Sequence, residues 1–199
     1  MFAVVILAGG AARRVGGATK PALRVGGRPL LNRVLDAVVQ AQPRIVVGPP
    51  DLAGLLPPDV TLTRESPPGG GPVAATAAGL ELLAHLDPTD HVGVFASDLP
   101  FLSPGAVNAL LVADDLDGRV LVDDDDRPQW LAGIWRLGAL VQRLAILGDP
   151  AGRSMRALTS GLRVAPIRLA DLPGPPAWFD CDSEDDLRRA EEWADGDGG

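Results

Sequence analysis

The sequence predicts an α/β fold in which helices flank a mostly parallel sheet, and three observations lead to that prediction. Short, continuously apolar runs alternate with amphipathic stretches through the first half of the chain, as expected of strands buried on both faces and the helices that cover them. A glycine-rich loop follows the first apolar run, and an aspartate, Asp98, follows a later one. In a Rossmann-like sheet both positions fall at the carboxyl ends of strands, where ligands bind, so we expect them to be neighbours.

The elements of the first half follow from these patterns. Phe2 to Leu7 is the expected first strand, and Leu30 to Gln40 is the expected first helix. The apolar face of that helix is formed by Leu31, Val34, Leu35, Val38 and Val39. Further strands are expected at Arg44 to Val47, Val60 to Thr63 and Val92 to Ala96, with a helix at Val73 to His85. Ser103 caps the next helix, whose first position is Pro104.

The second half has a different character. Two strands, Arg119 to Val122 and Gln129 to Trp135, are expected on either side of an acidic hairpin turn, Asp123 to Asp126. A helix at Leu137 to Leu147, a strand at Arg163 to Leu169 and a proline-rich stretch at Asp171 to Trp178 follow. Ser183 and Asp186 form a capping box that begins the last helix. We expect a single domain over residues 1–195, with halves at 1–118 and 119–195 and a frayed tail at 196–199.

Composition excludes several classes of protein. A formal net charge of -8, without a local basic cluster, argues against a nucleic-acid-binding surface. No apolar segment is long enough to span a membrane, and the first residues lack the charged region of a signal peptide. The single cysteine, Cys181, excludes an internal disulfide framework and is typical of the reducing cytoplasm. We therefore expect a cytoplasmic protein whose partners are small molecules or proteins.

The loop after the first strand carries the clearest functional signal. Lys20 is the one lysine in a chain that otherwise uses arginine for positive charge. An ammonium is a compact point charge, whereas a guanidinium is a broad planar fork, so the bias indicates that arginine would not serve at this position. Four glycines and a second cation, Arg14, lie close by in sequence. Backbone N–H groups and cations in this combination are typical of a polyphosphate-binding loop.

The loop is neither a dinucleotide-binding G-x-G-x-x-G motif nor a P-loop. Leu7 to Lys20 instead resembles the signature of nucleotidyltransferases, and most of all that of the molybdenum cofactor guanylyltransferases. Pro21 to Leu23 and Gly27 to Leu30 continue the likeness, whereas Thr19 replaces the aspartate that usually precedes the lysine. The resemblance implies a fold of the nucleotide-diphospho-sugar transferase type. It also implies a nucleotide-binding first half and an acceptor-binding second half.

The resemblance implies a role for Asp98 as the principal Mg²⁺ ligand. A strand-end carboxylate can hold this hard cation together with phosphate oxygens and waters. By itself, such an aspartate is more often a helix cap or a surface residue, and the phosphate loop in the same chain favours the metal site. Asp182 could complete that site, or could simply be a carboxylate favoured near the start of the last helix.

Other stretches of the chain continue the likeness. Gly70 to Ala74 resembles a loop that lies over the nucleotide, with Ala75 in place of its last glycine. Glu65 corresponds to an acidic residue that contacts the guanosine, and a solvated loop carboxylate is the alternative. Gly48 corresponds to a backbone position beside the base or ribose. Gly152 to Met155 resembles an acceptor-side stretch in which Arg153 meets a terminal phosphate.

Near the C-terminus, Asp180 to Leu187 is similar to a segment in which these enzymes carry two asparagines. Asp180 and Asp182 replace both of them. Some relatives that handle other nucleotides or acceptors have aspartates here, so the change leaves open a cytidylyltransferase for molybdopterin or a guanylyltransferase for a small phosphorylated acid. A non-catalytic nucleotide-binding regulatory or scaffolding protein is a further alternative, for which Thr19 and Ala75 are the motivating departures. Magnesium-dependent release of pyrophosphate separates that alternative from the enzymes.

Together these likenesses imply an enzyme that joins GMP from GTP to Mo-molybdopterin and releases pyrophosphate. Molybdoenzyme apo-proteins and cofactor-delivery proteins are the implied protein partners, and Mg²⁺ is the implied cofactor. The implied catalytic cations are Arg14 and Lys20, and the implied metal ligands are Asp98 and Asp182. The implied nucleotide contacts are Leu7, Ala8, Gly9, Gly10, Lys20, Gly48, Glu65 and Asp98. The implied acceptor contacts are Gly17, Arg153, Asp180 and Asp182.

Overall fold

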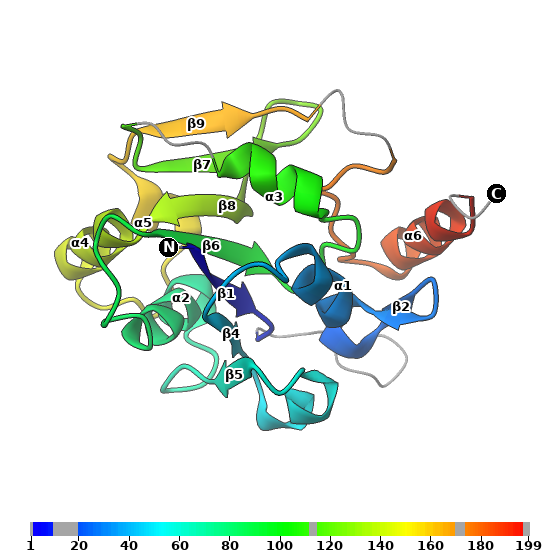
Figure 1. Cartoon of the computed structure of the whole chain (residues 1–199), viewed down its shortest axis with the longest axis horizontal. Helices are drawn as coiled ribbons and strands as arrows, with labels where there is room; N and C mark the ends of the chain where they lie inside the picture. Colours follow the sequence, from blue (N-terminus) through cyan, green and yellow to red (C-terminus); the bar gives the residue numbers. More distant parts are fainter. Residues whose placement is uncertain (1, 10–19, 112–114, 170–173, 197–199) are drawn as a thin grey trace.

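A computed structural model describes residues 2–9, 20–111, 115–169 and 174–196. Within these ranges the chain forms a seven-stranded sheet with the order β5-β4-β1-β6-β8-β7-β9 (Figure 1). The strands are β1 (Phe2–Leu7), β4 (Arg44–Val47), β5 (Val60–Thr63), β6 (His91–Ala96), β7 (Gly118–Val122), β8 (Pro128–Arg136) and β9 (Val164–Ile167). The helices are α1 (Leu30–Ala37), α2 (Gly71–Glu81), α3 (Pro104–Leu110), α4 (Leu137–Leu147), α5 (Met155–Thr159) and α6 (Glu184–Gly196).

The sheet is mostly parallel, which confirms the predicted fold class. β5, β4, β1 and β6 are parallel neighbours, and β7 and β9 are parallel to each other. β8 is the exception, because it pairs antiparallel with both β6 and β7. Its first residues therefore lie at the edge of the sheet where the neighbouring strands end. A two-stranded hairpin of β2 (Arg24–Val25) and β3 (Arg28–Pro29) lies outside this sheet.

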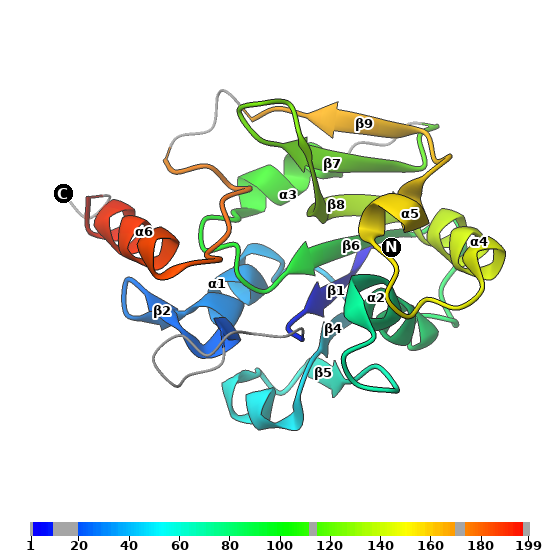
Figure 2. The same cartoon turned by 180° about the vertical axis from the view of Figure 1, so that it is seen from behind.

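The alternation of side chains along β1 divides the core between two faces. Val4 and Ile6 pack in a cluster with buried residues of α1 and α3. Ala3, Val5 and Leu7 pack in a second cluster with buried residues of α2, α4 and α5. Figures 1 and 2 show these two helical layers from opposite sides. Both faces of the central strands are thus buried, as their continuous apolar runs predicted.

The predicted caps at the starts of α3 and α6 and the predicted acidic turn are confirmed by hydrogen bonds. Ser103 Oγ accepts a hydrogen bond of 3.2 Å from the N–H of Ala106 and so caps α3. In the capping box, the Ser183 N–H donates to Asp186 Oδ2 at 2.8 Å, and the Asp186 N–H donates to Ser183 Oγ at 3.1 Å. In the acidic turn, the carboxylate of Asp123 accepts hydrogen bonds from backbone N–H groups within the turn.

The bounds of two helices differ from the prediction. α1 ends at Ala37 with Val38 as its C-cap, so Val39 leaves the apolar face and is 58% exposed. α2 begins at Gly71 and ends at Glu81, earlier than expected at both ends. α6 extends to Gly196, so the first residue of the expected frayed tail belongs to the helix, and residues 197–199 lie outside the described residues. The division of the chain at residue 118 stays a prediction.

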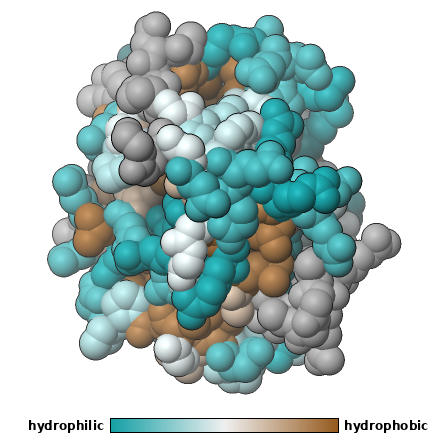
Figure 3. Space-filling view, turned by 90° about the vertical axis from the view of Figure 1, so that its right-hand side faces the viewer, coloured by the Kyte–Doolittle hydropathy of each residue, from teal (hydrophilic) through white to brown (hydrophobic). Residues whose placement is uncertain are grey.

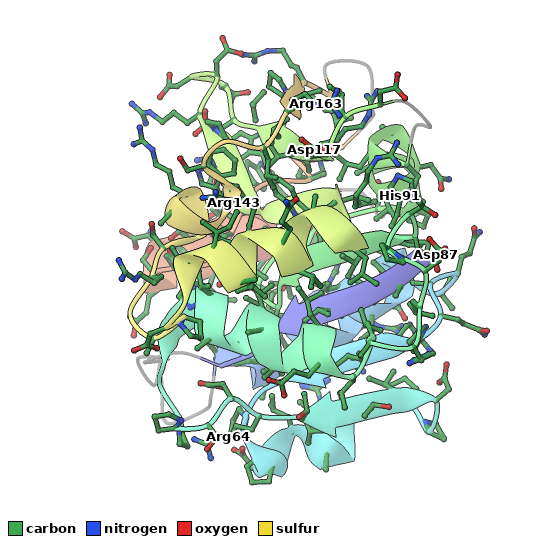
Figure 4. All side chains as sticks on the ribbon, turned by 90° about the vertical axis from the view of Figure 1, so that its left-hand side faces the viewer. Arg64, Asp87, His91, Asp117, Arg143 and Arg163 are labelled. Carbon is green, nitrogen blue, oxygen red and sulfur yellow. The ribbon has the colours of Figure 1, made fainter. Side chains whose placement is uncertain are left out.

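Three short helices were not predicted: α5, η1 (Lys20–Ala22) and η2 (Pro50–Leu55). α5 is held against α4 by Arg143, whose Nε donates to the carbonyl of Leu158 at 3.1 Å. β9 is tied to β7 by Asp117, whose carboxylate accepts the Arg163 N–H at 2.8 Å. This hydrogen bond lowers the pKa of Asp117, partial burial opposes the change, and the Arg163 side chain adds to it. Figure 4 shows Arg143, Asp117 and Arg163 on the side of the molecule that is on the left in Figure 1.

The end of the sheet at which β1 and β6 finish is the end that carries α6. Seen from that direction, the surface is largely hydrophilic, with hydrophobic patches between the hydrophilic areas (Figure 3). None of the helices in the described ranges has the length and apolar character needed to cross a bilayer.

The packing of α2 on β1 yields a stability prediction. A Cβ at Gly79 would lie 2.4 Å from Val5 Cγ1, closer than packed atoms allow. We expect Gly79→Ala to lower the free energy of unfolding by about 1–3 kcal/mol, because β1 is central and cannot move aside. Gly54→Ala is the matched control, since a Cβ there meets nothing within 4 Å. Urea unfolding of both variants tests this expectation. Equal urea midpoints for Gly79→Ala and Gly54→Ala would contradict the close contact between Gly79 and Val5.

Candidate active site

The carboxyl ends of three parallel strands meet at one edge of the sheet. Leu7, the last residue of β1, pairs with Val47 of β4 and with Ala96 of β6. Beyond these pairs, the Ala8 N–H donates to Val47 O at 2.8 Å and the Ser97 N–H donates to Leu7 O at 3.1 Å. The first residues of the glycine loop therefore lie beside the segment that leads to Asp98, as the sequence predicted.

A cavity of about 310 Å³ opens at this edge. The ends of β1 and β6 form one part of its wall, and the start of α2 forms another. Its lining comprises Leu7, Ala8, Gly9, Lys20, Pro21, Glu65, Gly71, Pro72, Ala75, Ala96, Ser97, Asp98 and Leu131. We refer to it as the first cavity. Its lining includes Lys20, Glu65 and Asp98, three charged side chains that the sequence singled out.

Lys20 bridges two carboxylates at the mouth of this cavity. Its Nζ forms ion pairs with Asp98 Oδ2 and with Asp182 Oδ1, the latter at 2.5 Å. The side chains of Lys20 and Asp98 are 18% and 14% exposed, whereas that of Asp182 is 73% exposed. Partial burial acts to lower the pKa of Lys20, but the two carboxylates, Asp98 above all, outweigh it and raise the pKa. The ammonium therefore stays charged at neutral pH.

Glu65 lies inside the first cavity and not in solvent. The residue is 6% exposed, so the alternative of a solvated loop carboxylate is wrong. Its Oε1 accepts the Gly69 N–H at 2.9 Å, and its Oε2 is buried without a hydrogen-bond partner among the described residues. A buried carboxylate oxygen is costly unless a donor reaches it. A donor that reached this oxygen would therefore be stabilising.

A second cavity, of about 440 Å³, adjoins the first. The two share Pro72, Ala96, Asp98 and Leu131. The other side of the second cavity is formed by the start of β8, the N-cap of α5 and the segment before α6, with Gln129, Trp130, Ser154, Trp178, Asp180 and Asp182 in its lining. Two ligands placed in the two cavities would thus meet beside Asp98.

Most of the chain matches a known protein family. The MobA-like NTP transferase domain matches residues 4–165 of the chain. The chain belongs to the MobA-like NTP transferase family. It is thus a nucleotidyltransferase by family, as the loop from Leu7 to Lys20 indicated.

Individual relatives support the same assignment. The chain is 29% identical over 196 residues to a molybdenum cofactor guanylyltransferase of Bradyrhizobium sp. (strain ORS 278), covering 96% of this chain and 92% of the relative. Its fold is similar to that of molybdopterin-guanine dinucleotide biosynthesis protein A from Archaeoglobus fulgidus, with a TM-score of 0.71, 22% identity and coverage of 98% and 100% of the two chains. It also matches 2-C-methyl-D-erythritol 4-phosphate cytidylyltransferase from Thermus thermophilus, with a TM-score of 0.66, 22% identity and coverage of 97% and 98%.

The carboxylates at the meeting point of the two cavities fit Mg²⁺. Asp98 Oδ1 is buried without a hydrogen-bond partner among the described residues, although Oδ2 of the same carboxylate contacts Lys20. In the ranges that the structure describes, no three His, Cys, Asp or Glu side chains are grouped to hold a metal ion. Mg²⁺ does not need such a group, because one or two carboxylates suffice when a substrate supplies phosphate oxygens. Asp98 and Asp182 meet that requirement.

Several residues that the family resemblance implicated lie elsewhere. Gly48 does not line the first cavity, and a Cβ there would lie 2.9 Å from Leu52 Cδ1 and 3.1 Å from Ala8 O. Arg153 is exposed at the rim, next to Ser154 in the lining of the second cavity. The loop that carries Arg153 is anchored near the first cavity, because the Gly152 N–H donates to Gly70 O at 2.8 Å. The remaining implicated positions, Gly10, Arg14 and Gly17, lie outside the described residues, as does Thr19.

Sequence reasoning missed Gln129 and Trp130, which line the second cavity. The sequence pattern indicates ligand-binding groups at the carboxyl ends of strands, where ligands bind in a parallel sheet. Because β8 runs antiparallel to β6, the beginning of β8 lies at that edge instead. The acidic hairpin turn that precedes β8 was the available signal, since a hairpin reverses the direction of the chain.

Asp180, a carboxylate in the lining of the second cavity, has a perturbed pKa. Its pKa is raised from 3.8 to about 6, first because partial burial disfavours the charged form and then because Asp182 and Asp98 are negative, while Lys20 opposes the rise. The residue still reaches solvent at the surface. The folded chain thus binds this proton more tightly than the unfolded chain does.

This shift makes stability depend on pH. The stabilising effect is complete below about pH 3.8 and is lost as the pH rises through about 6. We expect wild type to lose stability relative to Asp180→Asn between pH 4 and pH 7, because the variant has no carboxylate to ionise. Asp51→Asn is the control, because Asp51 is an exposed residue of η2. Urea midpoints across this pH range provide the measurement, and parallel curves for wild type and Asp180→Asn would contradict the shift.

Proposed function

We propose that the protein transfers GMP from GTP to the terminal phosphate of Mo-molybdopterin and releases pyrophosphate. One observation supports this above all others: two cavities adjoin at Asp98, with Lys20 beside it. A transfer between two bound ligands needs such a meeting point, because the reacting atoms must be held close and in line. The name of the Bradyrhizobium relative supports the choice of nucleotide and acceptor.

The first cavity would take the nucleotide. Gly9 lies in its lining, where a backbone N–H group can approach phosphate oxygens, and Lys20 supplies a positive charge. Glu65 would take the base, since its buried Oε2 has no hydrogen-bond partner among the described residues. Guanine presents two adjacent N–H donors on one edge, and a carboxylate accepts such a pair. This match supports GTP over CTP, whose base has a single donor group to offer.

The second cavity would take the acceptor. Trp130 and Trp178 are in its lining, and indole rings stack well on flat ring systems such as a pterin. Gln129 and Ser154 add groups that can both donate and accept hydrogen bonds. Arg153 at the rim could reach a terminal phosphate, because its loop is anchored beside the first cavity. Asp180 would favour an acceptor that donates a hydrogen bond to it.

The transfer needs little covalent chemistry from the protein. An oxygen of the acceptor's phosphate forms a bond to the α-phosphorus of the nucleotide, and the bond to the bridging oxygen breaks, so that pyrophosphate leaves. The attacking phosphate is already anionic near neutral pH, so no side chain has to remove a proton. Mg²⁺ held by Asp98 and Asp182 would supply positive charge beside the triphosphate. Lys20 would add to that charge as the bond breaks, and Arg14 is proposed to do the same.

Mass spectrometry of the products tests this proposal. Wild-type protein is incubated with Mg²⁺, metal-loaded molybdopterin and either GTP, CTP or ATP. We expect a guanine dinucleotide only with GTP, and at least about a hundredfold loss of rate in Lys20→Ala and Asp98→Ala, because both side chains act on the reacting phosphates. Arg127→Ala is the control for loss of a cation, since this arginine is 74% exposed in the hairpin turn. Circular dichroism checks that every variant folds.

Each alternative function predicts a different outcome of this experiment. A cytosine dinucleotide would keep the mechanism and overturn the choice of GTP. No product with any nucleotide, together with magnesium-dependent pyrophosphate release on another phosphorylated acceptor, would overturn the choice of molybdopterin. Nucleotide binding without pyrophosphate release would indicate the non-catalytic alternative. Near wild-type rates in Lys20→Ala or Asp98→Ala would contradict the assignment of the site.

The contact of Glu65 with the base predicts a change in selectivity. Glu65→Gln keeps the shape of the side chain but replaces one acceptor oxygen by a donor group. We expect kcat/KM for GTP to fall about tenfold or more, because a hydrogen bond to a charged group contributes about 1.5–3 kcal/mol. We expect kcat/KM for CTP to fall less, so the preference for GTP over CTP should decrease. Glu81→Gln, on the exposed side of α2, is the control. Equal losses for GTP and CTP would place Glu65 away from the base.

A further inference from the structure

A third apolar cluster lies outside the two layers that cover the sheet. We call it the outer cluster, and its members include Leu23, Val25, Phe101, Phe179, Cys181 and Trp193. It joins the β2–β3 hairpin to α6, which lie side by side beyond the end of the sheet (Figures 1 and 2). The cluster is small, and it is built from segments that are far apart in the sequence.

Each of these segments leads directly to a charged residue of the site. Leu23 follows Lys20 by three positions, Phe101 follows Asp98 by three, and Phe179 precedes Asp182 by three. The outer cluster therefore contains residues that lie three positions from each of Lys20, Asp98 and Asp182, the residues that form the ion pairs. Neither of the two main clusters does this, since each covers one face of the sheet.

Trp193 of α6 makes the ring contacts that connect these segments. Its ring lies edge-on to that of Phe179, with centroids 4.9 Å apart, and edge-on to that of Phe101 at 5.5 Å. Edge-to-face pairs at such distances are favourable beyond the area that they bury. The guanidinium of Arg189 lies 4.4 Å from the centre of the Trp193 ring on the same helix. This contact favours one orientation of the indole.

The carboxylate of Asp182 has little support of its own. It is 73% exposed, and its partner Lys20 is a lysine, whose charge sits at the end of a long and flexible stem. The backbone beside it is fixed, however, because the Cys181 N–H donates to Asp98 O at 3.2 Å and Phe179 is 7% exposed. The position of Asp182 is thus determined by the residues before it and by the capping box after it.

The hairpin that follows Lys20 is tied to the same helix. The Gly26 N–H donates to Glu191 Oε2 of α6 at 2.9 Å. Gly26 has a φ of +57°, and a Cβ there would lie 3.3 Å from the Cβ of Ala194. This close approach fixes the distance between the hairpin and α6. The last helix therefore contacts both the segment after Lys20 and the segment before Asp182.

We propose that Trp193 is a positioning residue, which acts through Phe101 and Phe179 to hold Asp182 against Lys20 and Asp98. The ion pairs at the site would then depend on a helix that contacts neither cavity. The effect on catalysis rests on the proposed function, whereas the effect on the position of the Asp180 to Asp182 segment does not. The test therefore needs one measurement that is independent of activity.

Cys181 provides that measurement. It is the one cysteine of the chain, lies between Asp180 and Asp182, and is 3% exposed. A chromogenic disulfide reagent can react with its thiol only when the segment opens, so the rate reports how firmly the segment is held. We expect Trp193→Ala to raise this rate about tenfold at a temperature well below its unfolding midpoint. Trp193→Phe should restore most of the protection, because its ring can still contact Phe179.

Glu192→Ala is the matched control, since this residue is exposed on the same helix. Its Cys181 should react at the wild-type rate. If Trp193→Ala does not fold, Arg189→Ala carries the test, because it removes the cation that lies 4.4 Å from the centre of the Trp193 ring and 5.7 Å from that of the Phe179 ring. A reaction of Cys181 at the wild-type rate in a folded Trp193→Ala or Arg189→Ala variant would overturn the proposal. So would a failure of Trp193→Phe to protect the thiol better than Trp193→Ala.

Kinetics of pyrophosphate release then separate positioning from general damage. We expect Trp193→Ala to lower kcat about tenfold and to raise the Mg²⁺ concentration that gives half the maximal rate. KM for GTP should change less than about twofold, because Glu65 and the start of α2 lie away from the outer cluster. Equal changes in kcat and KM would contradict a positioning role. If the wild type itself gives no product, the proposed function fails, while the thiol measurement still decides the position of the segment.

Discussion

The charge of Asp98 is the constraint on which the rest of the site depends. Its carboxylate lies at the end of a buried parallel strand and is 14% exposed. A negative charge at such a position is costly without a cation close by. Lys20 brings that cation from the far end of the glycine loop, and Asp182 shares it from the last part of the chain. Three segments that are distant in sequence therefore meet at one carboxylate.

The reversed direction of β8 gives the site its second half. In a purely parallel sheet only strand ends reach the ligand-binding edge. Here an antiparallel strand brings its beginning to that edge, with Gln129 and Trp130 beside the cavity. The hairpin leads from β7 into β8, and β7 and β9 extend the sheet away from the first cavity. Two adjoining cavities and a continuous sheet are thus obtained from one change of strand direction.

The two apolar clusters that stabilise the sheet differ from the outer cluster, which contacts the segments that carry Lys20 and Asp182. The two main clusters bury both faces of β1 and its neighbours, so the strand ends beside Asp98 have a rigid support. The outer cluster buries few residues and holds the hairpin after Lys20 and the segment before Asp182. The most exposed charge of the site, Asp182, is the one that depends on this smaller cluster. Segments held by few buried contacts open more easily than a core strand does.

The sequence by itself determined the class of fold, most strand positions, the caps at Ser103 and Ser183, and the nucleotidyltransferase family. These features are local: continuous apolar runs, capping residues and the loop up to Lys20 each act over a few neighbouring positions. Only the tertiary structure decided that β8 pairs with β6, that Glu65 is buried and that Trp193 contacts Phe101 and Phe179. These features could not be read from the sequence, because they depend on which distant segments pack together once both faces of the sheet are covered.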